Sequence, residues 1–214
     1  LGLGAADESL VRTLFAAVGV WDELSFTAAP AGVLELAVEP AGIVPVSLHN
    51  LVIRAAEALR NRSAIGSGAR IRLRKGIPVA GGMGGGSADA AAALVGLSGL
   101  WGLSLERDEL LVLGASLGAD VPFFLIGGAA WAVGRGTELT PLPDLAPWWV
   151  VLLPGTESIP TAEVYRALGA GEVDDRPQSA VYEWIARGGE VPFAACRNDL
   201  EPTVMRRWPD VATR

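Results

Sequence analysis

The stretch VAGGMGGGSADAAA, from Val79 to Ala92, directs the interpretation of the whole sequence, because five of the six positions 81–86 are glycine. Glycine loses more backbone entropy on folding than any other residue, so ordering such a run is costly. The serine, aspartate and alanines that follow favour a helix. A costly loop placed directly before a helix indicates that the loop itself has a role.

An anion site is the role that this arrangement favours. Consecutive glycines let successive backbone N–H groups turn toward one point and form a concave nest. A helix beginning at Ser87 would add its unpaired N–H groups and the positive end of its dipole. The Ser87 hydroxyl would cap that helix or reach a bound phosphate or metal ion, and the negative charge of Asp89 in the first turn would interact favourably with the helix dipole. A flexible hinge before a core helix remains the alternative.

Two familiar phosphate loops do not fit. A Walker A loop requires G-x-x-x-x-G-K-[ST], and Ser87 stands where the lysine belongs. The dinucleotide fingerprint G-x-G-x-x-G would begin at Gly82, and its third glycine also falls on Ser87.

Composition narrows the classes of function. The chain has 214 residues, of which 50% are hydrophobic, so it can form a sizeable core. A formal charge of −7 argues against nucleic acid or an anionic membrane as partner. No apolar run reaches the roughly 18 residues of a membrane span. The single cysteine, Cys196, excludes an internal disulfide, and His49, the single histidine, excludes a His-rich metal site. We expect a cytoplasmic protein.

Hydrophobic periodicity gives a coarse plan of the chain. Arg70, Arg72 and Arg74 alternate with aliphatic residues, which predicts a strand with a solvated arginine face; Arg74 and Lys75 also adjoin the glycine loop. We expect strands over residues 22–27, 33–38, 69–74, 121–126, 129–133 and 148–153, and a strand or short helix over 10–18. We expect helices over residues 50–59, 87–100, 105–117 and 180–187 and after Pro160, with a polar loop near 174–178.

A proline-rich segment, TPLPDLAP, occupies residues 140–147 and is the candidate domain boundary. The chain is accordingly divided into an N-terminal domain over residues 1–143 and a C-terminal, apparently truncated domain over 144–214.

A second informative segment is LGADVPFFL, residues 117–125. Asp120 follows a helix-ending glycine and precedes an apolar run, so its carboxyl is expected to be partly desolvated. Such a carboxyl suits a general base. An aspartate that merely caps a backbone amide in a turn is the simpler alternative.

Together these two segments resemble the GHMP kinases. Residues 78–91 match that superfamily's phosphate loop, P-x-x-x-G-[LM]-G-G-G-S-[AS]-D-A-A. LGADVPFF, PGTESIPTAEVY (residues 154–165) and HNLVIRAAEAL (residues 49–59) are similar to one bacterial family within it, which acts in non-mevalonate isoprenoid synthesis. The resemblance covers about residues 10–201.

The resemblance implies an α+β fold of two domains with ATP and substrate in the cleft between them. It implies an ATP-dependent kinase, aided by Mg²⁺, that phosphorylates the 2-hydroxyl of 4-(cytidine 5′-diphospho)-2-C-methyl-D-erythritol. Asp120 would be the catalytic base, and Thr161 and Tyr165 would line the substrate side, with Tyr165 stacking on cytosine. The implied nucleotide-binding residues are Asn50, Leu51, Lys75, Pro78, Val79, Ala80, Gly81, Gly82, Met83, Gly84, Gly85, Gly86, Ser87 and Ala88.

The resemblance has departures, and two other hypotheses remain. The family's N-terminal lysine motif, its Gly-Tyr-His segment and its C-terminal glycine-rich motif have no counterpart in the 214 residues. One alternative is another GHMP kinase, acting on mevalonate, homoserine or a sugar, which a substrate panel would distinguish. The other is a nucleotide binder without turnover. The sequence predicts no protein metal ligands and leaves the oligomeric state open.

Overall fold

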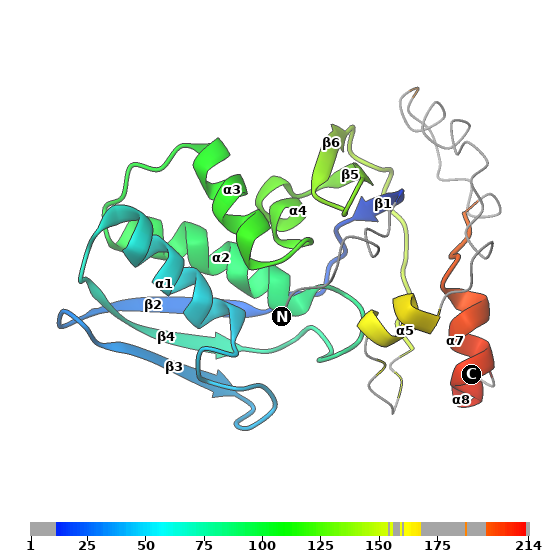
Figure 1. The fold of residues 1–214 in the computed structure, drawn as a ribbon, viewed down its shortest axis with the longest axis horizontal. Helices are drawn as coiled ribbons and strands as arrows, with labels where there is room; N and C mark the ends of the chain where they lie inside the picture. The colour runs from blue at the N-terminus through cyan, green and yellow to red at the C-terminus, as the bar shows by residue number, and fades with distance from the viewer. Residues whose placement is uncertain are drawn as a thin grey trace.

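The computed structural model describes residues 12–153, 155, 159, 161–167, 187 and 196–212. A three-stranded sheet lies under a layer of four helices, and a second small sheet lies beside that layer (Figure 1). Among the described residues, no helix has the length and apolar character needed to cross a membrane.

The larger sheet has the strand order β2-β4-β3, formed by β2 (Glu23–Ala29), β3 (Leu34–Glu39) and β4 (Gly68–Arg74). β2 runs antiparallel to β4, and β3 runs parallel to it. The predicted alternation of β4 is confirmed, since Ile71 and Leu73 are buried whereas its three arginines are exposed. These arginines pair with glutamates on neighbouring strands, as in the 2.8 Å contact of Arg70 with Glu35. The outer face of the sheet is therefore a solvated charge ladder.

Four helices lie on the inner side of this sheet, namely α1 (Leu51–Ser63), α2 (Gly85–Leu100), α3 (Arg107–Leu117) and α4 (Val121–Ile126). α1 and α2 lie next to the sheet, and α3 and α4 pack on the far side of α2. α2 packs against β2 and against the other three helices. Its buried residues join those of α1 and β4 in one hydrophobic core, which includes Leu59, Leu73, Leu94 and Leu97. The predicted helices over residues 50–59, 87–100 and 105–117 are thereby confirmed.

The second sheet has the order β1-β5-β6, with β1 (Thr13–Ala16), β5 (Ala129–Val133) and β6 (Glu138–Leu142) all antiparallel to their neighbours. β6 was not expected, because Pro141 suggested the start of the proline-rich segment. It lies at the edge of the sheet, where a proline costs no ladder hydrogen bond.

Three short helices follow: α5 (Thr161–Ala167), α7 (Glu201–Arg207) and α8 (Pro209–Ala212). Arg207 of α7 contacts Glu163 of α5 at 2.7 Å, which places these helices side by side. The helix expected after Pro160 is confirmed. The expected loop near residues 174–178 lies outside the described residues, as does the expected helix over 180–187 apart from Arg187.

Two predicted strands are wrong. Residues 121–126 form helix α4, in which Pro122 occupies the first turn, where its missing N–H costs nothing. A six-residue apolar run does not by itself distinguish a buried strand from a buried helix. Residues 148–153 have no regular secondary structure, since no strand of the described residues pairs with them.

The start of α2 also differs from the prediction. The helix begins at Gly85 with Gly84 as its N-cap, not at Ser87. Asp89 is consequently the fifth residue of the helix, beyond the first turn, and it is buried.

Candidate active site

The glycine loop has the backbone geometry of an anion nest. Positive φ angles occur at alternate residues, with 58° at Ala80, 71° at Gly82 and 68° at Gly84. Alternation of left- and right-handed conformations turns successive N–H groups toward one side. Within the described part of the chain, the N–H groups of residues 82–86 donate no hydrogen bond. These free donors, together with the start of α2, can receive an anion.

Close packing holds this loop in place. A side-chain carbon at Gly84 would lie 2.8 Å from the ring of Phe124 in α4, so only glycine fits there. Ser87 makes no side-chain capping bond to α2; its hydroxyl lies near Gly118, where α3 ends. The predicted capping role of Ser87 is therefore wrong, and its hydroxyl remains available to a ligand.

A pocket of about 330 Å³ lies over the loop, and we call it the glycine-loop pocket. It is lined by every residue expected at the nucleotide except Ala88, together with Val44, Pro45, His49 and Asp89. The structure thus brings together Lys75, which directly follows β4, with residues of the loop, α2 and the start of α1.

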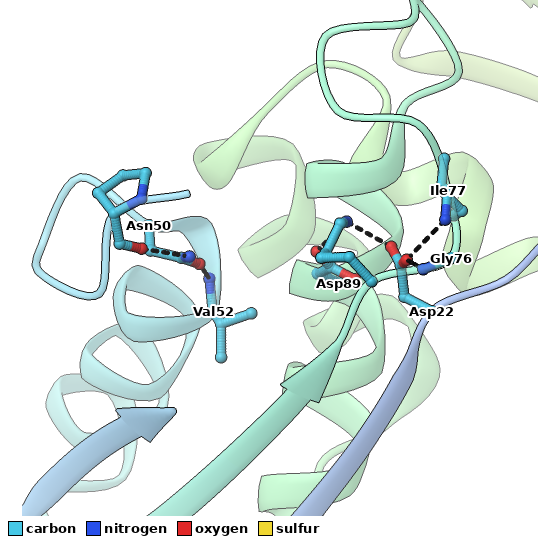
Figure 2. A network of polar contacts seen from close by, with 8 residues as sticks. Asp22, Asn50, Val52, Gly76, Ile77 and Asp89 are labelled. Atoms are coloured by element: carbon cyan, nitrogen blue, oxygen red, sulfur yellow. Dashed lines mark hydrogen bonds and ion pairs between the residues drawn. The ribbon is translucent and has the colours of Figure 1, made fainter. Parts of the chain in front are cut away.

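Asn50, which lines this pocket, makes two hydrogen bonds at the start of α1 (Figure 2). Its side-chain oxygen accepts the N–H of Val52 at 2.9 Å and so caps α1, while its amide nitrogen donates to the carbonyl of Pro45 at 2.8 Å. The buried side chain thereby ties the preceding loop to the helix. Leu51 begins α1 beside it.

Lys75 is part of a buried cluster at the base of the loop. Its ammonium donates to Asp22, and to Asp89 at 2.8 Å, and its side chain is only 5% exposed. Burial alone would raise the pKa of Asp22, but hydrogen bonds from Lys75 and from the backbone hold it below its usual value. Burial raises the pKa of Asp89 to about 7 against the opposing effect of Lys75. Lys75 lines the pocket with its charge already balanced by protein groups.

A second pocket, of about 720 Å³, lies on the other side of the loop, and we call it the Asp120 pocket. Its walls are mainly apolar, and its charged lining residues are Asp22, Asp89 and Asp120. Gly82, Met83, Gly84 and Asp89 line both pockets, so the two are separated by one thin wall. Ala88 lines this second pocket.

Asp120 stands at the N-cap of α4, yet its side chain makes no capping hydrogen bond. The simpler alternative, an aspartate that caps a turn, is therefore wrong. Although the residue keeps contact with solvent, burial of its carboxyl raises the pKa above the usual value. The carboxyl is consequently free to act on a group bound in the Asp120 pocket.

Comparison with known proteins places the chain in a family. Residues 50–128 match the model of the GHMP kinases N terminal domain. A 4-diphosphocytidyl-2-C-methyl-D-erythritol kinase of Pelotomaculum thermopropionicum is 43% identical over 204 residues, which cover 94% of this chain and 71% of that protein. The chain belongs to this kinase family. A relative of the same name from Nocardioides sp. is 41% identical, with 99% of this chain and 75% of the relative covered.

A solved structure agrees with this kinase family. The crystal structure of 4-(cytidine 5′-diphospho)-2C-methyl-D-erythritol kinase matches with a TM-score of 0.71 and 34% identity, covering 95% of this chain and 71% of that one. The expected α+β GHMP kinase fold is thereby confirmed.

The two residues expected on the substrate side of this kinase lie in α5. Thr161 is its first residue. Tyr165 is half-buried; burial, and then the negative charge of Asp120, raise the pKa of its hydroxyl. That influence places Tyr165 in the electrostatic neighbourhood of Asp120.

Asp22 is the polar residue of the site that the sequence did not reveal. It precedes β2 and is 53 residues from Lys75. An acid directly before a strand is an unremarkable pattern, and only the pairing of β2 with β4 brings the two side chains together.

Proposed function

We propose that the chain is an ATP-dependent kinase that phosphorylates the 2-hydroxyl of 4-(cytidine 5′-diphospho)-2-C-methyl-D-erythritol. The observation that carries the proposal is the juxtaposition of two pockets across the glycine loop, one lined by free N–H groups and the other by Asp120. The printed name of the relatives supplies the substrate.

In the proposed complex, ATP occupies the glycine-loop pocket and its phosphates meet the free N–H groups of residues 82–86. Pro78, Val79, Ala80 and Gly81 form the near wall, and Asn50 and Leu51 lie at the adenine side. The γ-phosphate lies at Gly82–Gly84, the wall shared with the Asp120 pocket. Positioning and charge neutralisation supply most of the catalysis in phosphoryl transfer.

The acceptor hydroxyl lies in the Asp120 pocket. Asp120 takes its proton as the oxygen forms a bond to the γ-phosphorus, and the bond from that phosphorus to the bridging oxygen of ADP breaks. A raised pKa makes the carboxylate a stronger base. Tyr165 stacks on the cytosine, and Thr161 lies at the start of the same helix.

Mg²⁺ fits this site as a companion of ATP. Among the described residues, no three His, Cys, Asp or Glu side chains gather into a metal-binding group. Mg²⁺ commonly keeps several waters and is held largely by substrate phosphates. It would neutralise phosphate charge beside the loop. We further propose a cytoplasmic protein whose partners are small molecules.

The direct test is ADP release from ATP and Mg²⁺ with this acceptor, compared with mevalonate and homoserine. Of the three acceptors, we expect only the cytidine-diphosphate compound to be phosphorylated. Turnover with mevalonate or homoserine instead would identify a different GHMP kinase. ATP binding with no turnover on any acceptor would identify a nucleotide binder.

Asp120→Asn tests the assignment of the base. We expect kcat to fall by about 10²–10⁴ while ATP affinity stays nearly unchanged, because the amide keeps the shape of the carboxyl but does not accept the proton. Asp108→Asn, at an exposed acid in the first turn of α3, is the matched control. Survival of activity in Asp120→Asn would reduce Asp120 to a structural residue.

A further inference from the structure

The cluster of Asp22, Lys75 and Asp89 joins three elements at one buried point. Asp22 precedes β2, Lys75 follows β4 and Asp89 belongs to α2. Their side chains are 2%, 5% and 5% exposed. Two carboxyl groups thus share one ammonium directly beneath the glycine loop.

Asp22 controls the segment that leads into the loop (Figure 2). One carboxylate oxygen accepts the N–H of Gly76 at 2.6 Å and that of Ile77 at 2.9 Å, and the other accepts Lys75. Pro78, the first residue of the loop, follows immediately. A displacement of Asp22 would therefore displace the entrance of the loop.

Asp89 is placed where its charge acts on both pockets. One oxygen accepts Lys75 at 2.8 Å, while the other is buried and has no hydrogen-bond partner among the described residues. The side chain lines the glycine-loop pocket and the Asp120 pocket alike. A second negative charge here would oppose any anion held by the loop.

We propose that Asp22 and Asp89 are positioning residues of the nucleotide site. Asp22 fixes the entrance of the glycine loop through Lys75 and the backbone of residues 76–77, and Asp89 is protonated when phosphates bind, so that the cluster carries no net charge. The inference rests on the proposed function, since it takes nucleotide phosphates as the ligand.

The charged groups around Asp89 determine how pH changes the affinity for nucleotide. Within the cluster, Lys75 contacts both carboxyl groups. Asp120 lines the Asp120 pocket together with Asp89, and His49 lines the glycine-loop pocket with it. Burial, reinforced by Asp22 and opposed by Lys75, raises the pKa of Asp89 to about 7. Below that pH the cluster is neutral; above it, the cluster has one negative charge beside the phosphates. Nucleotide affinity is therefore higher on the acid side.

The first experiment measures ADP affinity by calorimetry, with Mg²⁺ present, between pH 6 and 8.5. Asp89→Asn mimics the protonated side chain, so we expect its affinity for ADP to stay high as the pH rises. Over the same range the affinity of the wild type should fall about tenfold more than that of the variant, which is the effect of one pKa unit. The ionisation of ADP is common to both proteins and cancels in the comparison. Glu35→Gln, which alters an exposed ion pair with Arg70, should follow the wild type.

The second experiment compares Asp22→Ala with Asp22→Asn. We expect Asp22→Ala to raise the KM for ATP about tenfold, because the backbone at the entrance of the glycine loop loses its two hydrogen bonds to the carboxylate. Asp22→Asn should restore most of the wild-type KM for ATP, because its amide oxygen still accepts hydrogen bonds from the two N–H groups. It should also move the pH midpoint of ADP binding downward, since one cause of the raised pKa of Asp89 is removed. This shift keeps the test valid if Asp22→Ala does not fold.

Two outcomes would overturn the inference and leave the proposed function standing. One is an equal pH dependence of ADP affinity in wild type and Asp89→Asn. The other is a lower unfolding temperature in both Asp22 variants with unchanged nucleotide affinity and pH midpoint, which a purely structural cluster would give. Failure of the folded wild type to bind ADP or ATP would overturn the proposed function as well.

Discussion

At the scale of single residues, the site depends on backbone conformations that few side chains tolerate. Gly84 combines a φ of 68° with the ring of Phe124 at 2.8 Å from an added side-chain carbon. The sequence showed a glycine-rich loop, and it correctly excluded two familiar loop types at Ser87. It did not show which glycine was indispensable, because the ring that presses on Gly84 comes from a helix that was predicted as a strand.

Gly84→Val should abolish ATP binding, because a β-branched residue is strained at positive φ and would collide with Phe124. Calorimetric titration with ATP measures this. Gly102→Val is the control, since Gly102 has a φ of 66° with open space around it and lies beyond the loop. Equal ATP affinity in Gly84→Val and wild type would favour the hinge interpretation of the loop.

The ionisation of Asp89 predicts a pH dependence of stability. Its pKa is about 7 in the folded chain against a usual 3.8, so the contribution is complete below about pH 4 and is lost as pH rises through 7. The free energy of unfolding should fall over this range by at most about 1.4 kcal/mol per pH unit. Asp89→Asn should remove that slope in denaturant titrations. Asp22, whose pKa is lowered, acts in the opposite direction: its contribution to stability is present above about pH 4 and is lost as the pH falls further. If the free energy of unfolding of Asp89→Asn changed with pH as steeply as that of the wild type, the attribution of this pH dependence to Asp89 would be wrong.

At the scale of elements, α2 is the helix on which both pockets depend, and its contact with the sheet is close. An added side-chain carbon at Gly96 would lie 2.3 Å from the ring of Phe26 in β2. Helix propensity favours alanine over glycine by about 1 kcal/mol, whereas overpacking costs about 1–3 kcal/mol. The clash with Phe26 therefore determines how a substitution at Gly96 changes the free energy of unfolding.

Gly96→Ala should lower the free energy of unfolding by up to about 2 kcal/mol. Gly99→Ala, in the same helix with open space around the residue, should instead raise it by about 0.5–1 kcal/mol. Denaturant titration of the two variants measures the difference. Stabilisation by Gly96→Ala would show that Phe26 can move aside at little cost.

Elements with strong periodicity were predictable, and short apolar runs were not. β4 alternates over residues 69–74, which fixes both its type and its outward face. Residues 121–126 have no such pattern, and their helical state follows from packing against α2 and α3. Residues 148–153 are apolar enough for a strand but have no partner strand among the described residues.

At the scale of the whole molecule, the motifs were predictable and their assembly was not. The loop and Asp120 were identified separately, and the packing of α4 against α2 brings them into one pocket. The division into domains over residues 1–143 and 144–214 remains a prediction. It is supported by residues 143–153, which form no helix or strand and include a fully exposed Trp149.

Limited chymotrypsin digestion tests that division. We expect the first cleavage beside Trp148 or Trp149, because both are exposed in a segment without secondary structure. The N-terminal fragment should still bind ADP, since it holds the glycine loop and Asp120. It should not turn over the acceptor, because it lacks Tyr165. Mass spectrometry identifies the products, and initial cleavage within residues 13–142 would contradict the boundary.

The buried state of Lys75 has a practical consequence for chemical probing. It is the single lysine among 214 residues, and its amine is enclosed by two carboxyl groups. Acylating reagents attack exposed amines, so Lys75 should stay unmodified in the folded chain and react once the chain is unfolded. Acylation of Lys75, followed by mass spectrometry, would therefore report when the cluster beneath the glycine loop opens.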